Sequence, residues 1–184
     1  MADMTDGEMA RALAEAYEAE SHRQRPGKFI PPYDRAARAF SNAVPLVRAA
    51  GVTPEQWAKA VFNRFGTSMK GVIRPHHFNQ AGLVQIVAEQ SDGKSPEALA
   101  DLQSRLEVEL FEARLQFENP AFILTDPSNA LSPLSRFMLA NIYGLQEIKG
   151  KYRAEAMALR QSEPLRFERL KHYTAAMTAR MRAP

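Results

Sequence analysis

A helix-start pattern that occurs three times constrains the fold of this chain more than any other feature. In each case a Ser or Thr is followed directly by Pro: Thr53-Pro54, Ser95-Pro96 and Ser132-Pro133. The hydroxyl accepts a hydrogen bond from a first-turn N–H, and Pro suits the first helical position because an N–H there has no helical partner. A capping box at Thr5-Asp6-Gly7-Glu8 adds a fourth start. The pattern predicts a chain made of helices.

The spacing of apolar residues supports the same interpretation. In the helix expected over 95–118 they recur at steps of three and four, as a helix buried on one side requires: Leu99, Leu102, Leu106, Leu110, Ala113 and Phe117. Strand-like alternation is nearly absent. We therefore expect an all-α fold, a single compact multi-helix domain of about six to eight helices built around residues 95–118.

Proline content suggests how the chain is divided. Residues 1–24 read as an acidic N-terminal helix, 25–32 as a Pro-rich linker and 33–184 as the helical domain. Three prolines and a glycine prevent a helix in the linker. We expect the linker to lie over the surface, held there by Phe29 and Ile30.

Two further segments interrupt the helical pattern. Pro45 falls within an apolar stripe that begins at Tyr33, and a proline in mid-helix removes a hydrogen bond. We expect a kink or break near Asn42, which would cap a new helix ending at Gly51. Residues 121–125 follow Asn119-Pro120, and we expect an extended loop there.

Composition excludes several classes of protein. The chain has no cysteine, which excludes disulfides, thiolate nucleophiles and cysteine-based metal sites and fits a cytoplasmic protein. No two histidines have the i, i+4 spacing of a helical zinc site. No stretch approaches the roughly 18 consecutive apolar residues that a membrane helix needs. The acidic start lacks the order of a signal peptide. We expect a soluble protein without cofactor or metal.

Charge is distributed in alternating blocks along the chain. Residues 1–20 and 81–130 are acidic, whereas residues 21–80 and 131–184 carry ten basic residues each. Either the acidic elements fold against the basic ones, or two basic surfaces face an anionic partner. The sequence leaves both alternatives open.

The segment Ala50-Gly51-Val52-Thr53-Pro54-Glu55-Gln56-Trp57 carries the sharpest functional signal. Gly suits the sharp bend, Val52 fills the angle between two helices, and Thr53 caps the second helix. The segment resembles the turn and second helix of helix-turn-helix DNA-binding domains. Trp57, where a smaller aliphatic residue is usual, and the acidic Glu55 depart from that pattern. The resemblance covers about twenty residues within 42–65 and implies nucleic-acid binding.

Candidate contacts to nucleic acid follow from this resemblance. Trp57, Val61 and Phe65 share one helical face and should be buried. The other face and the basic loop at 66–77 supply side chains suited to bases and phosphates: Gln56, Lys59, Asn63, Arg64, Lys70, Arg74, His76 and His77. The alternative is an ordinary helical hairpin followed by a solvated loop.

The C-terminal helix is basic and amphipathic. One side carries Phe167, Leu170, Tyr173, Met177 and Met181, and arginines border it. Such a helix packs on its own domain with arginine stems over the rim, or contacts nucleic acid, or forms a homo-oligomer.

No serine elbow, paired-carboxylate signature or phosphate-binding glycine fingerprint is present, so we expect no enzyme. The leading hypothesis is a non-enzymatic nucleic-acid-binding protein. The alternative is a protein-interaction adaptor, inhibitor or assembly component whose charged helical surfaces match a protein partner. In neither case do we expect a membrane partner.

Overall fold

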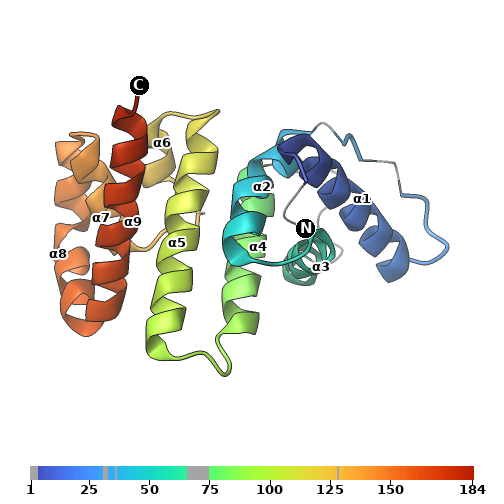
Figure 1. Cartoon of the computed structure of the whole chain (residues 1–184), viewed down its shortest axis with the longest axis horizontal. Coiled ribbons are helices and arrows are strands. Elements are labelled where there is room, and N and C mark those ends of the chain that lie inside the picture. Colours follow the sequence, from blue (N-terminus) through green and yellow to red (C-terminus); the bar gives the residue numbers. More distant parts are fainter. Residues whose placement is uncertain (1–3, 31–32, 36, 66–74, 128) are drawn as a thin grey trace. The chain divides into compact units, whose positions relative to one another are not determined.

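The computed structural model describes the chain except residues 1–3, 31–32, 36, 66–74 and 128, and gives no side-chain description for 65 and 75–77. Within the described residues it is all-helical, as expected, with nine helices and no strand (Figure 1). In chain order they are α1 (Asp6–Gln24), α2 (Arg38–Ala50), α3 (Pro54–Phe65), α4 (Pro75–Gln90), α5 (Pro96–Leu115), α6 (Pro120–Thr125), α7 (Pro133–Ile142), α8 (Gln146–Ser162) and α9 (Pro164–Arg182).

Packing divides the chain into two compact units, Met1–Glu89 and Gln90–Pro184. In the first unit, α1 packs on α2 and α3; in the second, α5 packs on α9 and α7 on α8. The division at 25–32 rests on proline content rather than on packing, and it stays a prediction. The boundary between the two units, near Glu89, does not coincide with any division expected from the sequence.

The predicted helix starts are confirmed. The Thr5–Glu8 capping box is present in full. Thr53 and Gln56 cap α3 reciprocally, with N–H to side-chain oxygen distances of 3.1 and 2.8 Å. Ser95 and Ser132 each accept a hydrogen bond of 3.2 Å from the N–H three residues on. Local chemistry alone therefore defines where these helices begin.

Of the kink or break expected near Asn42, the break and the helix cap at Asn42 were wrong, and the kink stays a prediction. Helix α2 continues from Arg38 to Ala50 with Pro45 inside it, and Asn42 is buried instead of capping a helix. Pro45 deprives the Ser41 carbonyl of its helical donor, but Ser41 is exposed, so water can solvate that carbonyl. Burial of Ala43, Val44, Leu46 and Val47 favours the continuous helix.

Two other local expectations also need correction. Residues 121–125 lie in helix α6, because Asn119 caps it through a 2.8 Å bond from the Phe122 N–H and Pro120 occupies the first helical position. Phe29 does not hold the linker to the surface, since its side chain is 88% exposed. Ile30 is half-buried.

Aromatic rings form the core of the first unit. Tyr17 contacts Phe40 and Phe78, with ring centroids 6.3 and 5.5 Å apart, and Phe40 lies 5.3 Å from Phe78. Burial of the Tyr17 phenol raises its pKa above the ordinary value. Trp57 of α3 is fully buried, and its ring lies directly against Gly82 of α4. Helices α1 to α4 thus share one core.

Helix α5 forms the core of the second unit. Leu106, Leu110, Phe111 and Ala113 are buried, which confirms the central part of the predicted stripe. Phe117 lies beyond the end of α5 and is 40% exposed. Helices α5 and α9 lie side by side (Figure 1).

Gly82→Ala should destabilise the first unit. A Cβ at this position would fall within 3.0 Å of three atoms of the buried Trp57 ring. We expect the free energy of unfolding to drop by about 1–2 kcal/mol, because overpacking a rigid core outweighs the better helix propensity of Ala. Chemical denaturation followed by fluorescence measures this directly, since Trp57 is the chain's one tryptophan.

The matched control is Gly7→Ala in α1, where a Cβ would meet nothing within 4 Å. It should leave stability unchanged or raise it by less than about 1 kcal/mol. Equal destabilisation by both variants would contradict the packing argument.

Candidate nucleic-acid interface

The turn between α2 and α3 has a left-handed glycine at the bend, as expected. Gly51 adopts the left-handed conformation with φ 67°, and its N–H donates to the Val47 carbonyl at 3.1 Å. Val52 is buried, and Trp57 and Val61 of α3 are fully buried. The buried side of α3 is therefore anchored, so its opposite face is held toward solvent.

Four of the predicted contact residues lie on the exposed part of α3: Gln56, Lys59, Asn63 and Arg64. These four side chains are not equally available to a ligand. The Oε1 atom of Gln56 accepts the Thr53 N–H at 2.8 Å, so its carbonyl oxygen is used in the helix cap. Lys59, Asn63 and Arg64 are the side chains that this face offers to a ligand.

An acidic side chain of α1 approaches the same face. The pKa of Glu20 is lowered, first by its hydrogen bond with Arg23 and to a smaller extent by Gln24 and by the positive charge of Lys59. The positive charge of Lys59 therefore interacts with the Glu20 carboxylate. That carboxylate would weaken the attraction of Lys59 for phosphate without cancelling it, because charges near the surface are screened by water.

The remaining predicted contacts are not tested. Lys70 and Arg74 lie outside the described residues. His76 and His77 lie in the first turn of α4, but their side chains are also outside the description. Their roles stay predictions.

Acidic and basic blocks pair with each other within the first unit. Arg48 bonds Asp6 at 3.1 Å, and Arg35 bonds Glu15 at 3.0 Å. Both carboxylates belong to the acidic helix α1. These pairs are largely exposed, so each contributes little to stability, but they occupy part of the positive charge of residues 21–80.

Pairing is more extensive in the second unit. Arg166, Arg169 and Arg180 of α9 pair with carboxylates of α5. Their partners are Glu107 at 3.0 Å, Asp101 at 2.5 Å and Glu112, respectively. The arginines that border the C-terminal helix thus bind α5 across the helix contact. They are not held out toward an anionic ligand.

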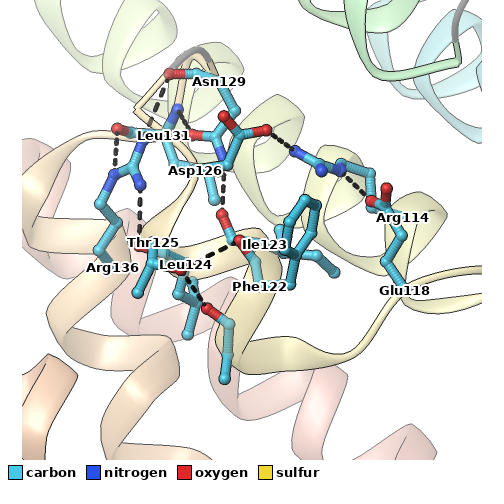
Figure 2. A network of polar contacts seen from close by, with 11 residues as sticks. Arg114, Glu118, Phe122, Ile123, Leu124, Thr125, Asp126, Asn129, Leu131 and Arg136 are labelled. Atoms are coloured by element: carbon cyan, nitrogen blue, oxygen red, sulfur yellow. Dashed lines mark hydrogen bonds and ion pairs between the residues drawn. The ribbon is translucent and has the colours of Figure 1, made fainter.

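Two buried arginines organise the segment around α6 (Figure 2). Arg136 of α7 donates to the carbonyls of Leu124, Asn129 and Leu131 at 2.8, 3.3 and 3.1 Å. Arg114 of α5 pairs with Glu118 at 2.6 Å and with Asp126 at 3.0 Å. This network has the composition of a binding site, but all of its donors except the buried Nη2 of Arg114 have protein acceptors. We interpret it as structural.

A pocket of about 260 Å³ opens where the start of α5 meets the junction of α8 and α9. Its lining is mostly apolar and includes Leu99, Ala100, Pro164 and Leu165. No cluster of nucleophiles lines it. Among the described residues no group of three or more metal-ligating side chains is placed to hold an ion. None of the described helices combines the length and apolarity needed to cross a bilayer.

Comparison with protein-family models, with curated proteins and with solved structures finds no match for this chain. The function of this chain is therefore inferred from its own residues and their geometry.

Arg136→Lys tests whether the buried arginine network is structural. A lysine ammonium cannot span three carbonyls as the planar guanidinium does. We expect the free energy of unfolding of the second unit to fall by about 3 kcal/mol, because acceptors of charged hydrogen bonds lose their donor. The measurement is denaturation followed by circular dichroism.

The control is Arg182→Lys at an exposed position near the C-terminus, which should change stability by less than about 0.5 kcal/mol. A stable Arg136→Lys variant that has lost a binding activity would instead mark the network as a ligand site.

Proposed function

We propose that this chain is a non-enzymatic protein that binds nucleic acid through the exposed face of α3. The observation that carries the proposal is the anchoring of α3: Trp57 and Val61 are fully buried, while Lys59, Asn63 and Arg64 are exposed on the same helix. A helix fixed on one side can present the other to a groove without losing much conformational entropy on binding.

The side chains on this face have complementary roles. Asn63 can make two hydrogen bonds to an adenine edge, and Lys59 can reach a guanine or a phosphate. Arg64, one residue further on, suits a backbone phosphate. Gln56 supports the site indirectly, because its side chain holds the start of α3.

The proposal leaves out the C-terminal helix as a second contact. Arg166, Arg169 and Arg180 already pair with carboxylates of α5, so binding a phosphate would first break these ion pairs. The basic segment at 66–77 remains a proposed backbone contact, with Lys70, Arg74, His76 and His77 as its members. A cytoplasmic location also remains part of the proposal.

A protein-interaction role is the second candidate, and exposed apolar side chains favour it. Phe29, Phe122, Leu165 and Met181 are 88%, 54%, 42% and 52% exposed. Large exposed apolar residues are a usual component of protein interfaces. Met181 at the end of α9 would place a homo-oligomer contact on the C-terminal helix.

The first experiment measures binding of labelled DNA and RNA by fluorescence anisotropy over a salt series. We expect Lys59→Ala/Asn63→Ala to weaken binding by about 10- to 100-fold, the loss that one or two base contacts would cause. The control Gln24→Ala/Lys28→Ala changes exposed residues of the same unit outside α3. It should weaken binding by less than about threefold, because one surface charge contributes only through phosphate attraction.

Absence of binding at low salt would contradict the proposal. Copurified proteins and the oligomeric state measured by light scattering would then test the protein-interaction alternative. Equal losses in both double variants would contradict the assignment to α3 while leaving non-specific binding in place.

A further inference from the structure

A row of cations lies along one side of α8. Lys149, Arg153 and Arg160 are separated by four and seven residues, so at 100° per residue they fall within about 40° of each other. Arg153 and Arg160 are exposed and Lys149 is half-buried.

Aromatic rings of the neighbouring helices support these cations. Lys149 and Arg153 both lie over the ring of Phe137 in α7, 5.6 and 5.9 Å from its centroid. Arg160 lies 4.4 Å from the centroid of Phe167 in α9. Lys149 also donates to the Asn141 Oδ1 at 2.7 Å. Cation–π contacts of this kind restrain the charged groups without neutralising them.

The surroundings of the row contain few carboxylates. Helix α7 has no acidic residue, and on α8 Glu147 and Glu155 lie at least about 120° away from the row. Glu163, between α8 and α9, pairs with Arg166 at 3.7 Å, and Glu168 of α9 is exposed. Within the part of the chain that the structure describes, no ion pair joins Lys149, Arg153 or Arg160 to a carboxylate.

This arrangement differs from that of the arginines on α9. Arg166, Arg169 and Arg180 have carboxylate partners on α5, whereas the α8 row rests on neutral rings. A buried or paired arginine stabilises its own unit. An exposed arginine held over a ring, as Arg153 and Arg160 are, retains its charge and the N–H groups at its edge, and those groups can bind phosphate.

The length of the row indicates what kind of anion it fits. Eleven residues of helix separate Lys149 from Arg160, about 16 Å along the axis. A single small anion reaches only one end of such a row. A polyanion with regularly repeated charges reaches all of it, and a nucleic-acid strand carries one charge for every 3.4 Å or so.

We propose that Lys149, Arg153 and Arg160 form a phosphate-backbone contact for nucleic acid, independent of base sequence and separate from α3. This inference depends on the proposed function in one respect, namely that the ligand is a nucleic acid. A phosphate contact contributes to affinity and to its salt dependence but carries no base preference.

The test compares two triple variants of the 184-residue chain, matched in charge. Lys149→Gln/Arg153→Gln/Arg160→Gln removes the row, and Lys94→Gln/Lys171→Gln/Arg182→Gln removes three exposed cations elsewhere in the same unit. Binding of duplex DNA, single-stranded DNA, single-stranded RNA and polyglutamate is followed by anisotropy at several salt concentrations. Circular dichroism melting verifies that both variants fold.

We expect the row variant to reduce the slope of log affinity against log salt on duplex DNA by about 2 to 3, since each lost phosphate contact contributes about 0.9. The control triple variant should keep the wild-type slope. Arg153→Lys/Arg160→Lys, which retains the charge, should also keep it.

Equal slopes in the row variant and the control would overturn the inference. So would binding of polyglutamate that is as tight as nucleic-acid binding and is lost in the row variant, because the surface would then fit an acidic protein. Running Lys59→Ala/Asn63→Ala in parallel separates the two proposals. If that variant binds normally while the row variant loses its slope, the α3 proposal fails and the α8 inference stands.

Discussion

The buried carboxylate of Glu107 holds the second unit together. It accepts hydrogen bonds from the Ser132 N–H at 2.7 Å and the Ser135 hydroxyl at 2.9 Å, and it pairs with Arg166 at 3.0 Å. Burying one carboxylate away from water costs several kcal/mol. Several hydrogen bonds to the charged group together must offset this desolvation cost. That requirement places the starts of α7 and α9 against the middle of α5. Removing one partner would leave an uncompensated buried charge between these helices.

The first unit depends on a tight apolar contact instead. Trp57 is fully buried, and Gly82 is the residue that leaves room for its ring. This contact joins α3 to α4 and determines which side of α3 faces solvent. The position of Lys59, Asn63 and Arg64 therefore follows from packing on the opposite side of the helix. The packing of Trp57 against Gly82 therefore determines both the core contact and the side of α3 that is open to a ligand.

Pairing of opposite charges determines which cations are left for a ligand. Arginines of α9 and of residues 21–50 have carboxylate partners in α5 and α1, so the alternating charge blocks largely fold against each other. Cations without a carboxylate partner in the described part of the chain include those on the exposed face of α3 and those of the α8 row supported by Phe137 and Phe167. Net charge alone does not distinguish these two groups, because an arginine counts equally whether it meets a carboxylate or a ring.

The sequence by itself was enough to predict the helix starts at Thr5, Thr53, Ser95 and Ser132. It was also enough to predict the turn at Gly51. Each depends on groups only a few residues apart. The same local rules failed at Asn42, where burial of α2 outweighed the cost of Pro45, and at Phe29, whose exposure depends on what lies beside it. The Glu107 and Arg136 networks and the support of the α8 row join residues distant in sequence. Their energies depend on desolvation and on distances across helices, which exist only once the helices have packed.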